Sequence, residues 1–268
     1  MHLKRWITGL IALPFLIFLV YKGGIFFTIL VGAASVVAMW EYYRLVAPGK
    51  AGSSSGIILW WGYGICCAIV WAAYAVGTDL ILMLLPLNLV AIAVISIFQF
   101  KANRSVLETI VRQLQGIIYI ALPLSFLILI REGQSGAIWI FLLLAVIFAG
   151  DTSAFYVGSY MGRHKLSPAI SPGKTIEGAI GGLAANLAIG SAGKALFLPG
   201  LPWGLCILFF LAVGIAGQAG DLFESEMKRS SNIKDSSAIL PGHGGILDRI
   251  DALLFAAPVA YLFIRFIF

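Results

Sequence analysis

The chain of 268 residues is 60% hydrophobic and only 11% charged, with 18 lysines and arginines against 12 aspartates and glutamates. A water-exposed surface normally needs about 25% charged residues, so this composition excludes a soluble globular protein and indicates an integral membrane protein. The net charge of +6 does not indicate nucleic-acid binding, because basic residues beside membrane spans usually mark cytoplasmic loops or contact anionic lipid head groups.

Nine apolar runs are each long enough to cross a bilayer as a helix. A spanning helix needs about 20 apolar residues, and only a helix or a closed barrel satisfies its own backbone in lipid. The strict alternation of a barrel strand is absent from the sequence. We therefore expect an all-α, polytopic integral membrane protein with about nine transmembrane helices. The runs lie at roughly residues 5–21, 24–46, 56–76, 79–99, 113–130, 137–160, 175–198, 203–226 and 249–267.

The first run has the basic start and apolar middle of a signal peptide, but no small-x-small cleavage site follows it, so we interpret it as a retained span. Along the whole chain, lysines and arginines collect at alternate ends of the spans, fourteen on one side and four on the other. Cytoplasmic loops carry the excess, which predicts a cytoplasmic N-terminus. An odd number of spans then places the C-terminus outside.

The acidic residues are unevenly distributed along the chain. Eight of the twelve follow residue 150. We therefore expect residues 1–130 to form a transmembrane scaffold of about five helices, and residues 131–268 to form a catalytic region of about four. The catalytic region would carry cytoplasmic loops at residues 161–175 and 227–248.

Three aspartates fall within or at the ends of late spans, all on the predicted cytoplasmic side: Asp151, Asp221 and Asp248. An aspartate inside a span costs roughly 2.5 to 3.5 kcal/mol on insertion scales, so it usually faces a cavity, a partner or an ion. One alternative is that each simply pairs with a nearby lysine or arginine. Their similar depth instead favours a shared site, and partly hydrated carboxylates suit Mg²⁺, which also binds substrate phosphates.

Two helical patterns extend this acidic group. If the helix at 203–226 continues to residue 228, then Asp221, Glu224, Ser225 and Lys228 share one face. Asp251 lies one turn after Asp248. The carboxylates therefore indicate phosphate chemistry that is assisted by a divalent metal ion.

The sequence PGHGG at residues 241–245 directly precedes the last predicted helix. Its glycines allow backbone amides to approach an anion closely, and a helix N-terminus favours negative charge. This arrangement predicts a phosphate cradle. The alternative is an ordinary turn, which Pro-Gly and Gly-Gly also signal, with His243 as a polar loop residue instead of a phosphate donor or proton carrier.

A second polar loop, GRHKLSPAISPGKTIEG at residues 162–178, contains a GKT sequence. It is not a P-loop, because Pro168 occupies the position of the first glycine and no strand is expected before it. Lys174 beside a helix start that Thr175 or Ser171 caps would form an anion site. The alternative is a basic anchor on the cytoplasmic side, which fits Arg163 and Lys165 better.

The polar segment at residues 225–251 resembles the signature of the phosphatidate cytidylyltransferases, also called CDP-diglyceride synthetases. The resemblance rests on Ser225, Lys228, Arg229, Lys234, Asp235, Pro241, His243, Gly244, Gly245, Asp248, Arg249 and Asp251. Residues 151–178 are similar to the family's other characteristic region, except that Gly173 stands where a basic residue is expected. The N-terminal half resembles the family only in its hydrophobic spans.

The resemblance implies that the phosphate of phosphatidic acid attacks the α-phosphorus of CTP, giving CDP-diacylglycerol and pyrophosphate in phospholipid biosynthesis. It implies a Mg²⁺ requirement, a second cation such as K⁺, a homodimer, and an active site at the cytoplasmic face of the inner membrane. The metal ligands would be Asp221, Asp248 and Asp251. The substrate-binding and catalytic set would add Asp151, Lys174, Ser225, Lys228, Arg229, Lys234, His243, Gly244, Gly245 and Arg249.

Two other functions use similar residues. A CTP-dependent lipid kinase would transfer the γ-phosphoryl group instead of the cytidylyl group. An ion-coupled transporter would use intramembrane acids to carry protons or sodium, but it predicts internal repeats, which this sequence lacks. The aspartate-rich motif of the CDP-alcohol phosphotransferases is also absent from the sequence.

Overall fold

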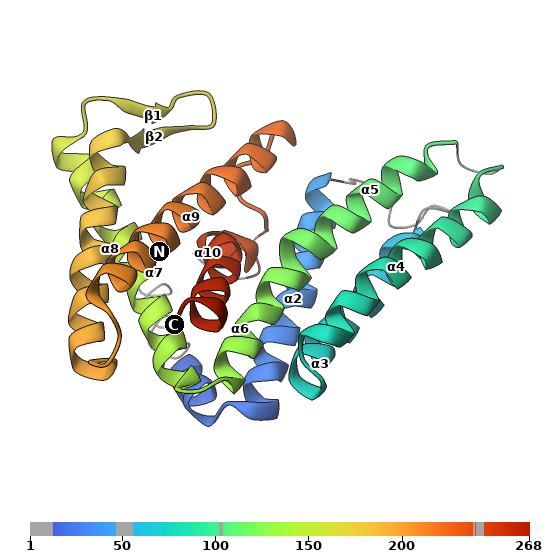
Figure 1. The fold of residues 1–268 in the computed structure, drawn as a ribbon. Helices are drawn as coiled ribbons and strands as arrows, with labels where there is room; N and C mark the ends of the chain where they lie inside the picture. The colour runs from blue at the N-terminus through green and yellow to red at the C-terminus, as the bar shows by residue number, and fades with distance from the viewer. Residues whose placement is uncertain (1–12, 47–55, 102–103, 238, 240–243) are drawn as a thin grey trace. The chain divides into compact units, whose positions relative to one another are not determined.

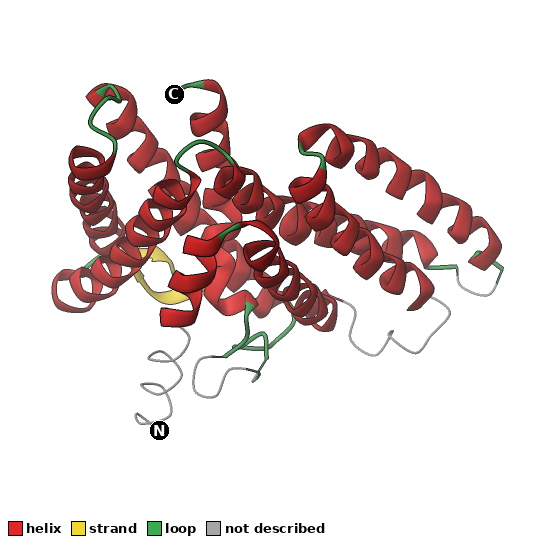
Figure 2. Ribbon diagram, turned by 90° about the horizontal axis from the view of Figure 1, so that it is seen from below, coloured by secondary structure: helices red, strands yellow, loops and turns green. Residues whose placement is uncertain are grey.

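The computed structural model describes residues 13–46, 56–101, 104–237, 239 and 244–268, and these are almost entirely helical (Figures 1 and 2). Seven helical segments are long and apolar enough to cross a membrane, namely α2 (Gly24–Val46), α3 (Gly56–Ala75), α4 (Thr78–Gln99), the run Val106–Glu132, α7 (Gly136–Met161), α8 (Ile176–Phe197) and α9 (Trp203–Ser230). A shorter apolar helix spans Leu13–Lys22, and α10 spans Leu247–Phe266.

The predicted class, an all-α polytopic membrane protein, is confirmed. Each of the nine predicted runs contains a helix in the described part of the chain. Seven of these meet the length and hydropathy expected of a span, so the count of nine stays a prediction, as does the cytoplasmic N-terminus.

The fifth predicted run is longer than expected. It consists of α5 (Val106–Gly116), a π-helical turn η1 (Ile117–Ala121) and α6 (Leu122–Glu132). Pro123 lies just after the turn, and a proline inside a helix lacks an N–H group and clashes with the carbonyl four residues earlier, here that of Tyr119. The wider π turn relieves this crowding without ending the helix.

The chain divides into two compact units. One comprises residues 1–132 and 235–249, and the other comprises residues 133–234 and 250–268. This division does not test the predicted roles of the two halves. The scaffold at residues 1–130 and the catalytic region at residues 131–268 stay predictions. The segment 235–249 belongs structurally with the first unit, although the sequence analysis grouped it with the late helices.

The first unit is held together by apolar packing and by a small buried polar network. Tyr42, Ile58 and Ile120 are among its fully buried side chains. Asn88 on α4 and Gln113 on α5 are also fully buried, and their side-chain amides donate to each other over 3.1 and 3.2 Å. In lipid such bonds join helices that the hydrophobic effect does not drive together.

In the second unit, α7 and α8 pack along each other through glycines (Figure 1). A Cβ atom at Gly178 would lie 2.7 Å from the Ala154 carbonyl oxygen and 3.1 Å from the Gly158 Cα atom. Small residues at such interfaces allow helix backbones to approach closely in membranes.

Replacing Gly178 with alanine should destabilise this unit by about 1 to 3 kcal/mol, because the added methyl group overpacks the contact between α7 and α8. Thermal unfolding in detergent would detect the loss. Gly204→Ala is the matched control, since a Cβ atom there meets nothing within 4 Å. Equal melting temperatures for the two variants would contradict the packing account.

The segment predicted as a second polar loop contains a short hairpin. Strand β1 (Lys165–Ser167) pairs antiparallel with β2 (Ser171–Thr175), and these are the strands in the described residues (Figure 2). The expectation that no strand lies near the GKT sequence was therefore wrong. Strands of three and five residues, with Leu166 as their one large apolar side chain, carry no periodic apolar pattern from which to predict them. The expected cap is confirmed, because the Thr175 hydroxyl accepts a hydrogen bond from the Gly178 N–H group and starts α8.

Candidate functional site

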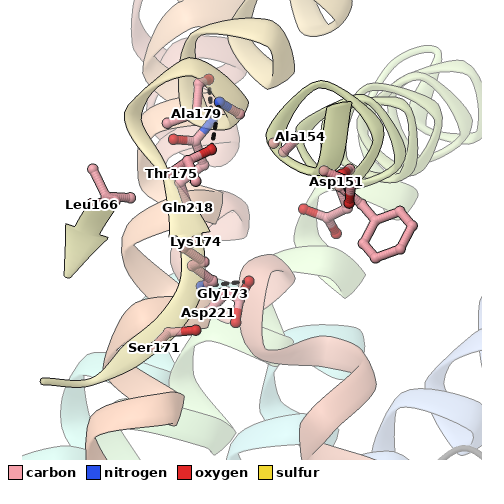
Figure 3. A pocket seen from close by; sticks show the side chains of 14 residues that line it. Asp151, Ala154, Leu166, Ser171, Gly173, Lys174, Thr175, Ala179, Gln218 and Asp221 are labelled. Atoms are coloured by element: carbon pink, nitrogen blue, oxygen red, sulfur yellow. Dashed lines mark hydrogen bonds and ion pairs between the residues drawn. The ribbon is translucent and has the colours of Figure 1, made fainter. Parts of the chain in front are cut away.

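A pocket of about 450 Å³ lies in the second unit, lined by α7, the hairpin, the start of α8 and α9. Its polar side chains include Asp151 from α7, Lys174 from β2, and Gln218 and Asp221 from α9 (Figure 3). Apolar side chains such as Phe155 and Leu166 complete the wall. The pocket therefore combines charged groups with a surface that suits an apolar chain.

Lys174 and Asp221 form an ion pair inside this pocket, with Nζ 2.7 Å from Oδ2 (Figure 3). The hairpin carries Lys174 to α9, which explains how residues 47 positions apart in the sequence meet. Both side chains keep some solvent access, with exposed fractions of 27% and 37%. The Lys174 Nζ atom itself is buried, so a ligand that exchanged partners with this pair would have to displace the Asp221 carboxylate from it.

Asp251 on α10 adds a third carboxylate to the neighbourhood. It interacts electrostatically with Asp221 and Asp151, and with Lys228. Helices α9 and α10 approach closely here, because a Cβ atom at Gly220 would lie 2.5 Å from the Asp251 carbonyl oxygen. Three carboxylates from separate late helices therefore interact within the second unit, and the predicted metal set of Asp221, Asp248 and Asp251 stays a prediction.

These carboxylates fit a magnesium site of the kind that a substrate completes. Within the described residues, no group of three His, Cys, Asp or Glu side chains is close enough to hold a metal ion by itself. Mg²⁺ is commonly bound by one or two carboxylates together with water and substrate phosphates, so a full protein cage is not required. Asp221 and Asp151, which both line the pocket, supply hard oxygen donors of the right kind.

Helix α9 continues to Ser230, so Asp221, Glu224, Ser225 and Lys228 do share one face as the pattern indicated. Lys228, which was predicted to bind phosphate, forms an ion pair with Glu224. The Glu224 side chain is fully buried and that of Lys228 is 12% exposed. Lys228 therefore already has a protein partner in the second unit. A substrate phosphate would have to share the Lys228 ammonium group with Glu224.

Arg229 joins the hairpin to the end of α9. Its Nε donates to the Ile170 carbonyl over 3.2 Å, and another guanidinium nitrogen donates to the Ile233 carbonyl over 3.3 Å. Lys234 is exposed in the segment that follows. The predicted phosphate-binding role of both residues stays a prediction, and the observed role of Arg229 is to fix the turn of the hairpin.

Gly173 lies in the pocket wall, at the position where a basic residue was expected. A Cβ atom there would meet nothing within 4 Å. The structure therefore gives no packing reason for a glycine at this position.

In the first unit, Asp248 holds the glycine-rich segment. Its carboxylate accepts hydrogen bonds from the Gly245 N–H group over 2.8 Å, and from the Ser236 N–H and hydroxyl groups over 3.1 and 2.9 Å. Gly244 has a φ of +80°, which a glycine adopts without strain. Arg249 follows in the first turn of α10, and His243 lies outside the described residues.

Residues 241–243 of the predicted phosphate cradle lie outside the described residues, and the backbone amides that follow them bind protein carboxylates. The N–H groups of Ile246 and Leu247 donate to Glu41 over 3.0 and 2.6 Å, and that of Gly245 donates to Asp248. An incoming phosphate would have to displace these bonds. The carboxylates at this helix start belong to the protein itself, and the phosphate cradle stays a prediction.

Glu41 on α2 was missed by the sequence analysis. It is fully buried and accepts hydrogen bonds from Ser236 and Ser237 as well as from the two amides. The signal was available, because a glutamate inside an apolar run is as costly as the three aspartates that were singled out. Glu41 lies far from the eight acids that follow residue 150, and its partners are about 200 positions away in the sequence.

This fold and this pocket define a membrane protein with a polar, acid-lined site among its late helices. The chain is similar throughout its length to known enzymes of that kind. A model of the cytidylyltransferase family matches residues 3–267. Proteins named phosphatidate cytidylyltransferase are similar to the chain at 34% identity over 266 residues in Bacillus subtilis, and at 32% over 260 residues in Brucella abortus and 263 in Staphylococcus aureus.

These alignments cover 95 to 97% of this chain and 92 to 96% of the relatives. The chain therefore belongs to the cytidylyltransferase family, and the resemblance inferred from the signature is confirmed. The predicted class of membrane-bound nucleotidyltransferase is confirmed with it.

Proposed function

We propose that this protein transfers the cytidylyl group of CTP to phosphatidic acid, giving CDP-diacylglycerol and pyrophosphate. The observation that carries the proposal is the Lys174–Asp221 ion pair in a pocket that also contains Asp151. Substrate phosphates would engage Lys174, which frees the Asp221 carboxylate for a divalent cation. The relatives named phosphatidate cytidylyltransferase support the choice of substrates.

In this reaction the residues of the chain mainly position the substrates and balance their negative charge. The phosphate of the lipid is already an ionised nucleophile, so no covalent enzyme intermediate is needed. Its oxygen forms a bond to the α-phosphorus of CTP while the bond to the pyrophosphate leaving group breaks. Phosphoryl transfer of this kind is accelerated by in-line alignment and by neutralisation of negative charge.

We assign Mg²⁺ to Asp221 with Asp151 or Asp251 nearby, and Asp248 stays a predicted fourth contributor. When bound, the ion would offset the charge of the triphosphate and polarise its oxygens. The basic excess in the loops supports a site at the cytoplasmic face of the inner membrane. The resemblance extends the proposal to a second cation such as K⁺ and to a homodimer.

The test uses purified protein, phosphatidic acid, Mg²⁺ and CTP labelled at the α-phosphate. We expect label in the lipid phase and an equal amount of released pyrophosphate, both lost when EDTA removes the metal. A parallel reaction with γ-labelled CTP separates the lipid-kinase alternative. Label from the γ-phosphate in the lipid, with none from the α-phosphate, would contradict the proposal.

Replacing Lys174 with methionine should weaken substrate binding. The side chain keeps its length and loses its charge, so we expect KM for CTP or phosphatidic acid to rise about tenfold, equal to the loss of one charge-assisted hydrogen bond of ~1.5 kcal/mol. Steady-state kinetics at saturating metal would measure it. Lys165→Met is the control, because Lys165 lies on the same hairpin but outside the pocket lining. Matching KM values for the two variants would refute the assignment.

A further inference from the structure

Glu41 is a buried carboxylate whose oxygens accept hydrogen bonds from hydroxyl and backbone N–H groups. Its side chain is fully buried near the end of α2. Oε1 accepts from the Ser237 hydroxyl over 2.5 Å and from the Ile246 N–H group over 3.0 Å, and Oε2 accepts from Leu247 N–H over 2.6 Å. The Ser236 hydroxyl lies 3.2 Å from Oε2.

The number of donors explains how a carboxylate is tolerated there. Burying an unpaired carboxylate costs several kcal/mol, and only a full set of hydrogen bonds offsets the loss of water. Three donors bind Glu41 alone and a fourth, the Ser236 hydroxyl, is shared with Asp248; they belong to residues 236, 237, 246 and 247, about 200 positions later in the chain. Glu41 and these residues therefore depend on each other for their placement.

The same contacts reach Asp248 through one shared side chain. The Ser236 hydroxyl lies 3.2 Å from the Glu41 carboxylate and 2.9 Å from the Asp248 carboxylate. A hydroxyl carries one proton, so it donates to one carboxylate at a time, while the Ser236 N–H group donates to Asp248. The position of Asp248 is therefore coupled to Glu41 through Ser236.

Glycine at position 245 is also explained by Glu41. A Cβ atom there would collide with the Glu41 Oε1 atom and with the Ser236 hydroxyl. The glycine is required by a protein carboxylate that sits against the backbone, and its amide is already donated to Asp248.

We propose that Glu41 is a positioning residue for the reaction, which holds Ser236, Ser237 and the first amides of α10 in place and thereby orients Asp248. This inference rests on the proposed function, because it assumes that Asp248 serves the catalytic site. Glu41 itself does not contact substrate in this account. Its effect reaches the chemistry only through Ser236 and the N-terminal turn of α10.

The experiment compares Glu41→Gln, Glu41→Asp and wild type in purified full-length protein. Glutamine keeps one acceptor oxygen but turns an NH₂ group toward donors, whereas aspartate keeps both acceptor oxygens on a shorter stem. We expect kcat to fall about 10- to 100-fold in Glu41→Gln with KM for CTP within twofold of wild type, the size of effect seen when a supporting residue is lost. Glu41→Asp should recover part of kcat.

Amide hydrogen exchange supplies a readout that is independent of activity. The Ile246 and Leu247 amides donate to Glu41, so peptides covering them should exchange at least several-fold faster in Glu41→Gln. Ser35→Ala is the matched control, because Ser35 is a buried polar residue on the same helix whose hydroxyl bonds only within α2. It should change neither exchange in this segment nor kcat.

Wild-type exchange at Ile246 and Leu247 in Glu41→Gln would overturn the inference, as would a kcat equal to that of Ser35→Ala. If Glu41→Gln does not fold, Ser237→Ala carries the test, since it removes one of the four donors. It should lower kcat several-fold at unchanged KM, and an unchanged kcat would count against the inference. If the wild-type protein shows no cytidylyl transfer, only the proposed function is refuted. The hydrogen-exchange comparison would still test whether Glu41 fixes the Ile246 and Leu247 amides.

Discussion

Replacing Asp221 with asparagine should reduce cytidylyl transfer by about a thousandfold. The substitution removes the negative charge that faces Lys174 in the pocket and the predicted ligand of the metal ion. A metal ion that stabilises charge in the transition state contributes several kcal/mol, and ~4 kcal/mol corresponds to a factor of about 10³ in rate. Initial rates with α-labelled CTP, measured across a range of Mg²⁺ concentrations, would show the loss.

The matched control for this variant is Glu226→Gln, which removes one charge from the same helix at an exposed position outside the pocket. It should retain wild-type rates. A double-mutant cycle with Lys174→Met adds a second criterion, since residues in direct contact are expected to have non-additive effects. Asp221→Asn activity close to that of Glu226→Gln would show that the pocket is not the site of transfer.

Asp248→Asn should also abolish most of the transfer, by about 10²- to 10³-fold, while the protein stays inserted in the membrane. Two losses combine in this variant. The predicted metal ligand disappears, and the Ser236 and Gly245 donors, which converge on Oδ2, lose a charged acceptor and keep at most a neutral amide oxygen. Leaving such donors unsatisfied costs about 1 to 3 kcal/mol, so we expect a lower melting temperature as well.

The loss of a metal ligand and the loss of hydrogen bonds can be separated by measuring how activity depends on Mg²⁺ concentration. If Asp248 binds the ion, the residual activity should need a higher Mg²⁺ concentration for half-saturation, which a purely structural role would not change. Asp79→Asn, an exposed acid at the start of α4, controls for the change in net charge. Turnover by Asp248→Asn equal to that of the control would exclude Asp248 from the site.

The transmembrane helices were predictable because their signal is local. A run of apolar residues of spanning length is sufficient evidence for a helix in lipid, and α2 begins and ends at the predicted residues 24 and 46. The helical rise of about 1.5 Å per residue gave Asp151 and Asp221 a similar predicted depth. Both residues line one pocket in the second unit.

What the sequence did not reveal depends on contacts between distant residues. The pairing of Lys174 with Asp221 needs a hairpin that is too short and too polar to show a periodic pattern. Glu41 meets its partners about 200 residues later. No local pattern records such a contact, so the carboxylates that bind the amides of Gly245, Ile246 and Leu247 could not be predicted.

The predicted site residues fall into two groups according to their contacts in the structure. Asp151, Lys174 and Asp221 line the pocket in the second unit. Lys228 and Arg229 make protein contacts there, and Asp248 does so in the first unit. Variants of the first group should change substrate or metal dependence directly, whereas variants of the second group should also change stability. The resemblance to the family did not provide this distinction, because it implies roles for these residues without showing their contacts.

The most direct measurement is the position of a bound divalent ion. Mn²⁺ replaces Mg²⁺ at oxygen sites of this kind, and its anomalous scattering locates it in crystals of the full-length protein grown with Mn²⁺ and CTP. We predict an anomalous peak against the Asp221 carboxylate, with the Lys174 side chain turned toward the nucleotide phosphates. A peak remote from Asp221, with the Lys174–Asp221 pair intact beside bound nucleotide, would contradict the account.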